Sequence, residues 1–125
     1  MNPYAGMICL VKYPFTDKAS AKLRPALVAG ADNPIFLALG GGSSDQAGMN
    51  VNFIKITSDE EPGLYNIIVD PARPEYACTG LPKVSTVCCW NINTIHRGLI
   101  ERELGKAPDD LMEQVKEKLR LRLQL

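Results

Sequence analysis

One stretch near the end of the chain, 108–123, has a clear helical period, and it limits what the rest can form. Leu111, Val115, Leu119 and Leu123 recur at steps of four residues, which places them on one face of a helix. A proline and two acidic residues suit the start of such a helix, and basic residues fill its second half. The sequence therefore predicts one terminal amphipathic helix.

The remaining apolar segments are short, contain β-branched residues and are separated by proline, glycine and polar loops, which is typical of strands. These segments lie at 6–13, 25–29, 34–39, 51–57, 64–69 and 85–95. The glycine-rich stretch at 40–48 is interpreted as a loop, and 99–104 as either a short strand or a helical turn. Many short strands followed by one helix predict a small, mostly antiparallel barrel or sheet, with one domain spanning 1–125.

The charge balance limits the partners of the protein. Lysine plus arginine and aspartate plus glutamate are equal at 14 each, whereas a general nucleic-acid binder has a basic excess. Any contact with nucleic acid must then be local, or be built by pairing two chains. The chain has no apolar run of about 18 residues and no signal-peptide pattern at its start, so we expect no membrane contact and a cytoplasmic location.

The cysteines and the single histidine do not form a metal-binding pattern. Cys9, Cys78, Cys88 and Cys89 include no C-x-x-C spacing, so we expect no metal and no cofactor. All four are interpreted as buried, reduced, structural thiols, and the adjacent pair must point to opposite faces if it lies in a strand. His96 is either an acid–base group or an exposed turn residue, and the second interpretation is favoured because no acid or nucleophile stands near it in sequence.

Two edges of predicted strands carry groups suited to phosphate. Arg24 is followed by Pro25, which forces an extended backbone, and its guanidinium is a planar fork of donors. Thr57 and Ser58 add hydroxyl donors at the end of another strand. The acidic run at 59–61 is interpreted as a solvated turn rather than a cation site. On composition alone, an ordinary role at a strand edge is the favoured interpretation of both the arginine and the hydroxyls.

Four stretches together resemble the PemK/MazF (Kid-like) family of toxin endoribonucleases. They are MICLVKYPFTD at 7–17, KLRPALV at 22–28, FIKITS at 53–58 and the closing segment at 80–123. The resemblance implies a mainly β fold with α, an SH3-like, partly open β-barrel of the CcdB/MazF type with a C-terminal helix. It also implies a homodimer that cuts single-stranded RNA at short preferred sequences without metal, by attack of the 2′-hydroxyl. The expected partners are RNA and a cognate antitoxin protein.

The resemblance also assigns roles to individual residues. The catalytic residues that it implies are Arg24, Thr57 and Ser58. The RNA-binding residues that it implies, in the first loop, are Phe15, Thr16, Lys18 and Lys22. Trp90 is a candidate RNA-binding residue because its aromatic ring can stack on bases. Tyr13 is a further candidate for stacking on bases, with core packing as the alternative for at least one of these aromatic residues.

The sequence departs from some family members in the predicted strand at 85–95. Cys88, Cys89 and Trp90 stand where those members have an Arg-Cys-Asp stretch, which removes one possible acid–base pair. Two other functions therefore stay open. One is a non-catalytic module on the same barrel that binds protein or nucleic acid, and the other is a gyrase inhibitor resembling CcdB.

Overall fold

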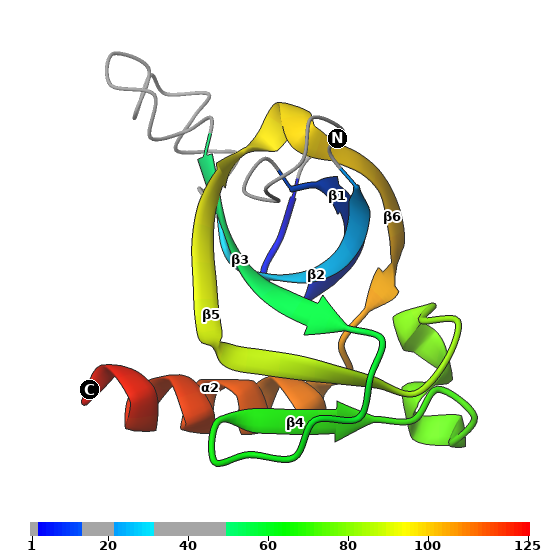
Figure 1. The fold of residues 1–125 in the computed structure, drawn as a ribbon, viewed down its shortest axis with the longest axis vertical. Helices are drawn as coiled ribbons and strands as arrows, with labels where there is room; N and C mark the ends of the chain where they lie inside the picture. Colours follow the sequence, from blue (N-terminus) through cyan, green and yellow to red (C-terminus); the bar gives the residue numbers. More distant parts are fainter. Residues whose placement is uncertain (1–2, 14–21, 32–49) are drawn as a thin grey trace.

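The computed structural model describes residues 3–13, 22–31 and 50–125, and within them it shows a curled antiparallel sheet with one long helix (Figure 1). The strands are β1 (Met7–Lys12), β2 (Leu23–Gly30), β3 (Asn50–Thr57), β4 (Asn66–Val69), β5 (Ser85–His96) and β6 (Ile100–Lys106). Helix α2 spans Asp109–Leu123, and two 3-10 helices, η2 and η3, span Pro74–Thr79 and Arg97–Leu99. The strand order β4-β5-β3-β2-β1-β6 leaves β4 and β6 at the two edges, so the predicted open, barrel-like sheet with a C-terminal helix is confirmed.

The strand predictions at 6–13, 51–57, 64–69 and 85–95 are confirmed to within two residues at each end. The segment predicted as 99–104 contains the end of η3 followed by β6. The strand predicted at 34–39 and the loop at 40–48 lie outside the described residues.

The strand predicted at 25–29 is confirmed as β2, but its start differs in a way that affects the site. Strand β2 begins at Leu23 rather than at Pro25, so Arg24 lies inside the strand and not at its mouth. Pro25 is tolerated there opposite Leu10 of β1, although proline cannot donate to the ladder.

The face of the sheet toward α2 carries one apolar core, called here the helix-side core. Ile8, Leu27 and Ile54 lie in one row across β1, β2 and β3, and Leu111 and Val115 of the helix pack against the same cluster. Figure 1 shows α2 lying along β4 and the first part of β5. Burying one apolar stripe of the helix against this face is what holds the helix in place.

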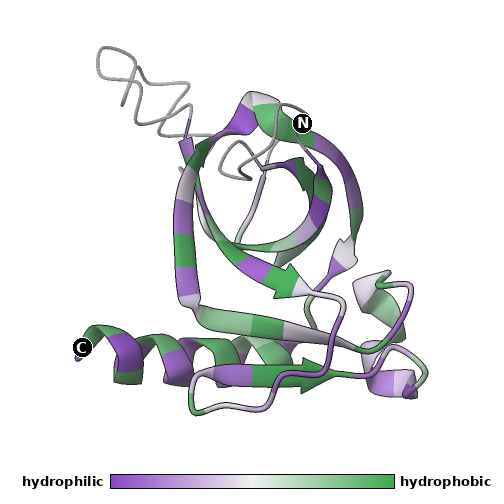
Figure 2. Ribbon diagram, viewed as in Figure 1, coloured by the Kyte–Doolittle hydropathy of each residue, from purple (hydrophilic) through white to green (hydrophobic). Residues whose placement is uncertain are grey.

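The predicted helix stripe is confirmed except at its end. Leu111 and Val115 are fully buried and Leu119 packs against the helix-side core, but Leu123 is 51% exposed. The last turn of α2 extends beyond the strands on which the helix packs (Figure 1), which is consistent with the half-exposed side chain of Leu123. Figure 2 shows the alternation of apolar and polar residues along the helix and along β5.

The other face of the sheet carries a second core, called here the opposite-face core. Its side chains come from β1, β2, β3 and β5, which the curl of the sheet brings together (Figure 1). Its members are Met7, Cys9, Val11, Tyr13, Ala26, Val28, Val51, Phe53 and Ile95. Leu99 of η3 and Ile100 of β6 pack against it, and among the described residues no residue of α2 belongs to it.

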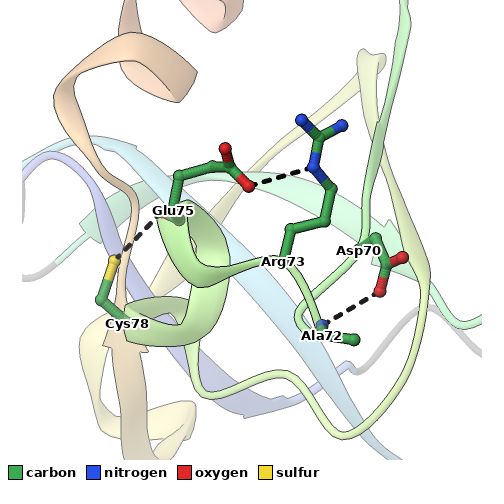
Figure 3. A network of polar contacts seen from close by, with 5 residues as sticks. All are labelled: Asp70, Ala72, Arg73, Glu75 and Cys78. Atoms are coloured by element: carbon green, nitrogen blue, oxygen red, sulfur yellow. Dashed lines mark hydrogen bonds and ion pairs between the residues drawn. The ribbon is translucent and has the colours of Figure 1, made fainter.

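Helix η2, absent from the sequence predictions, packs closely on β6. Gly80 ends η2 with φ of +69°, and a Cβ there would lie 2.0 Å from the carbonyl oxygen of Leu104, so only glycine fits. The turn before η2 is held by exposed polar contacts (Figure 3): the N–H of Ala72 donates to Asp70 Oδ1 at 3.0 Å, and Arg73 Nε donates to Glu75 Oε1 at 3.0 Å. This turn positions the residues that lead into β5.

Candidate phosphate-binding site

The strand register places the two predicted site strands side by side. Strand β2 pairs with β3 up to Ala26 opposite Lys55, and Lys55 in turn lies opposite Cys88 of β5. Arg24 and Thr57 each lie two residues beyond the Ala26–Lys55 pair, toward the same end of the sheet. Because side chains alternate along a strand, both lie on the face of Ala26, which is the face of the opposite-face core. The strand register therefore places Arg24 and Thr57 on the same face, at the same end of adjacent strands.

Arg24 is half-buried at the edge of the opposite-face core. It lies opposite Val11 of β1 and close enough to Tyr13 to act on its phenol. Burial raises the pKa of Tyr13, and the positive charge of Arg24 partly opposes that shift. Within the described part of the chain, Arg24 forms no ion pair with an acid. Its guanidinium is therefore a charged donor group on this face that no described carboxylate engages.

The two predicted hydroxyl residues are placed differently. Thr57 is the last residue of β3, half-buried, and lies opposite Thr86 of β5. Ser58 is exposed and follows the end of the strand. The ladder therefore fixes the position of Thr57 on the face of Arg24, whereas it does not fix that of Ser58.

The acidic run at 59–61 is exposed, as predicted, but it is tied down beside the site. The Thr86 hydroxyl donates to the Asp59 carbonyl at 2.6 Å and accepts from the Glu61 N–H at 2.9 Å. The pKa of Cys88 is raised, mainly by burial and next by the negative charge of Glu61, while Lys55 opposes the shift. The carboxylate of Glu61 and the ammonium of Lys55 thus act on the same thiol, and the acid reduces the net positive charge of this face.

A bulge in β5 separates the site from the rest of that strand. The β5 partners of β3 jump from Ile92, opposite Ile54, to Cys88, opposite Lys55, so residues 89–91 have no partner on β3. Bulges of this kind bend a strand and change the direction of its side chains. Trp90 lies in the bulge and is 48% exposed. An exposed indole at a bend can offer its face to a ligand.

The other predicted RNA-binding residues are placed as follows. Lys22 is exposed just before β2. Tyr13 is only 5% exposed and belongs to the opposite-face core, so core packing, and not base stacking, describes it. Outside the described residues lie Phe15, Thr16 and Lys18.

His96 lies at the opposite end of the β3–β5 ladder from Thr57, and three of the four cysteines are buried. His96 is exposed at the far end of β5 and its Nδ1 accepts the N–H of Gly98 at 2.9 Å, which confirms the turn interpretation. Three of the thiols are buried, but Cys78 is exposed, so the prediction of four buried thiols is wrong there. The adjacent Cys88 and Cys89 do face opposite sides of the sheet, because only Cys89 joins the helix-side core.

One site residue was missed. The sequence predictions include Lys55 only as part of the strand at 51–57, yet it lies on the same face as Arg24 and Thr57. The alternation itself was the available signal, because Lys55 and Thr57 are two residues apart on one strand. No cluster of three or more metal-ligating side chains occurs in the ranges that the structure describes. The arrangement offers two cations and a hydroxyl to an anion.

Comparison with known proteins agrees with the fold. Residues 4–123 match the family described as PemK-like, MazF-like toxin of type II toxin-antitoxin system. No curated protein matches the chain by sequence.

Solved structures with this fold include three that cover nearly the whole chain. The MazE–MazF complex of Deinococcus radiodurans has 19% identity and a TM-score of 0.70, covering 100% of this chain and 99% of that one. The Mycobacterium tuberculosis toxin MazF-mt6 has 20% identity and a TM-score of 0.67, covering 95% and 97%. A mycobacterial endoribonuclease in complex with its cognate antitoxin has 15% identity and a TM-score of 0.67, covering 98% and 96%. At these identities the likeness establishes the fold.

Proposed function

We propose that this chain, which belongs to the PemK-like, MazF-like family of toxins of type II toxin-antitoxin systems, is an endoribonuclease that cuts single-stranded RNA. The observation that carries the proposal is the placement of Arg24 and Thr57 on one face of the sheet, at the same end of adjacent strands. Structures of the same fold are described as endoribonucleases, which supports the same reaction here.

In the proposed reaction the RNA supplies its own nucleophile. The 2′-hydroxyl oxygen bonds to the adjacent phosphorus as the bond to the 5′-oxygen breaks, which leaves a 2′,3′-cyclic phosphate and a 5′-hydroxyl. No metal takes part in this scheme. Arg24 and the Thr57 hydroxyl donate to the non-bridging oxygens as negative charge grows there. Removing one such donor typically costs about 10²–10³-fold in rate.

Arg24 is assigned to charge stabilisation and not to proton abstraction, because arginine stays protonated in proteins. Ser58 is a further hydroxyl that RNA can recruit from the exposed turn. The requirement for a 2′-hydroxyl makes the activity selective for RNA over DNA.

The proposed RNA path runs from the first loop, across Arg24, toward the β5 bulge. Lys22 at the start of this path and Trp90 at its end are both exposed, which supports roles in binding the backbone and stacking a base. Base stacking on an aromatic residue contributes about 1–3 kcal/mol per base. The first-loop residues proposed to bind RNA are Phe15, Thr16 and Lys18.

We further propose that the protein acts as a cytoplasmic, one-domain toxin that forms a homodimer and is neutralised by a cognate antitoxin. Leu121, Leu123 and Leu125 are 51%, 51% and 86% exposed near the end of the chain, and exposed apolar groups of this kind favour contact with another chain. A related fold has been solved with its antitoxin, which supports that partner. None of the helices in the described ranges is long and apolar enough to span a membrane.

The test is cleavage of a long, weakly structured RNA by the purified protein in EDTA, with Arg24→Ala beside it. Arg120→Ala, an exposed arginine on α2, is the matched control. We expect wild type and the control to cut and to leave 2′,3′-cyclic phosphate ends, and Arg24→Ala to lose at least about 10²-fold in rate while staying folded.

Equal cutting by all three proteins contradicts the role of Arg24. Folded wild type that binds RNA or protein without cutting favours the non-catalytic binding module instead. Binding to a gyrase subunit without RNA cleavage favours the CcdB-like alternative.

A further inference from the structure

We propose that Lys55 is a second backbone-binding cation of this site, which contacts the RNA phosphates beside Arg24. The inference rests on the proposed function for the identity of the ligand, but its geometry is independent of whether RNA is cut. It concerns a residue that the predicted motif, an arginine with a Thr-Ser pair, leaves out.

The row of residues across the sheet leaves Lys55 as its one long side chain. From β1 to β5 the row consists of Cys9, Ala26, Lys55 and Cys88. Its other three members are small and buried, while Lys55 is half-buried. The aliphatic stem can therefore lie over its small neighbours while the ammonium reaches solvent. No other side chain in the row extends far enough to meet a bound ligand.

The position of Lys55 relative to Arg24 suits a shared ligand. Because Ala26 lies directly opposite Lys55, Arg24 is its diagonal neighbour on the same face. Diagonal neighbours of this kind are about 7–8 Å apart at the backbone, which is within reach of two long side chains. Two cations at this spacing, with the Thr57 hydroxyl beside them, can hold one stretch of a phosphodiester backbone.

The same face changes character at this row. Along β3 the face runs from the fully buried Phe53 through Lys55 to Thr57, and along β2 it runs from the buried Val28 and Ala26 to Arg24. On both strands, buried residues of the core are thus followed by a cationic residue within the same two rows of the ladder. The polar end of the face is a continuous patch shared by β2 and β3, and not a single charged residue.

The ammonium of Lys55 is not engaged by an acid in the described part of the chain. Lys12 and Lys116, by contrast, pair with Glu101 and Glu113 at 3.5 and 3.6 Å. Glu61 is the carboxylate near this row, since both it and Lys55 act on the Cys88 thiol, but it forms no ion pair with Lys55. A half-buried cation without a paired acid is suited to an external anion.

The test measures binding of a single-stranded RNA oligonucleotide whose 2′-hydroxyls are methylated, so that it cannot be cut. Lys55→Met removes the charge and keeps an unbranched side chain, Lys55→Arg keeps the charge, and Lys116→Met is the control for losing a lysine. Each phosphate contact contributes about 0.7 to the slope of log affinity against log salt for single strands. We expect Lys55→Met to lower affinity several-fold and to reduce the slope by about that amount, and the other two variants to resemble wild type.

The outcomes separate this inference from the proposed activity. If wild type binds but does not cut unmodified RNA, and Lys55→Met still lowers the salt slope, the cleavage proposal fails and the role of Lys55 stands. An unchanged affinity and slope in folded Lys55→Met overturns the role of Lys55 even if wild type cuts. If folded wild type neither binds nor cuts, both proposals are overturned.

Discussion

The two faces of the sheet have the same strands and very different contents at the end where β3 terminates. On one face, Ile54 and Ile56 continue the helix-side core, which α2 covers. On the other, Phe53 is followed by Lys55 and Thr57, and among the described residues no residue of α2 belongs to that core. The face under α2 stays apolar to the end of β3, whereas the other face ends in two cations and a hydroxyl. The alternation of side chains along β3 is enough to place the apolar core on one face and the candidate site on the other.

The largest expected effects come from two adjacent residues on opposite faces. Thr57→Ala should lower the rate of RNA cleavage by about 10²-fold or more, because a donor to the developing charge is lost. Ile56→Ala should instead lower the free energy of unfolding by about 2–5 kcal/mol, because it leaves a cavity in the helix-side core. Cleavage assays and urea unfolding of both variants measure the two effects. Similar losses of stability in both would show that the faces are not separate.

The second comparison uses two leucines of the same helix stripe. Leu111 is fully buried and Leu123 is 51% exposed. Leu111→Ala should cost about 2–5 kcal/mol of unfolding free energy, and Leu123→Ala less than about 1 kcal/mol, as is usual for exposed positions. Urea midpoints at several protein concentrations provide the measurement. A large, concentration-dependent loss for Leu123→Ala would instead place that residue in a contact between chains.

The smallest expected effect is a difference in pH dependence between adjacent thiols. Burial raises the pKa of Cys89 to about 11 from an ordinary value of 9.0. Burial also raises the pKa of Cys88, but the positive charge of Lys55 opposes that shift. Because the folded state favours the neutral thiol, this stabilisation is complete below pH 9 and is lost as pH rises toward 11.

The measurement is the urea midpoint between pH 8 and pH 10.5 under reducing conditions. Cys89→Ala should flatten the alkaline decline more than Cys88→Ala. The slope is the relevant quantity, because replacing either buried thiol changes stability at neutral pH as well. Equal slopes in wild type and Cys89→Ala would show that the helix-side face does not hold this thiol in its neutral form.

The elements with a strong local pattern were predictable. The helix beginning at Asp109 has both a four-residue repeat and suitable charges at its ends, and β3 alternates clearly. Helix η2 had no such signal, because its position depends on Gly80 and Gly105 allowing close contact with the distant strand β6. The exposure of Leu123 was equally hidden, since the periodicity of a helix does not show where its supporting sheet ends.

The candidate site was predictable in its residues and not in its geometry. Arg24 and Thr57 were found through motifs, but their common face depends on the pairing of Ala26 with Lys55, which a single sequence does not reveal. The same pairing brought Lys55 into the site. The resemblance includes Lys55 within the FIKITS stretch, but it assigns roles only to Thr57 and Ser58 there, so it gives this lysine no function.

The β5 bulge at 89–91 also has a consequence for how this chain can change. Before the bulge, the odd-numbered Val87 contributes to the helix-side core, and after it the even-numbered Ile92 packs there. The bulge therefore changes which residues face α2, from the odd-numbered ones before it to the even-numbered ones after it. Gain or loss of one residue there would move the side chains of one half of β5 to the wrong face of the sheet. A change of two residues would keep every side chain on its present face. Length variation at this corner should thus be tolerated in even steps only.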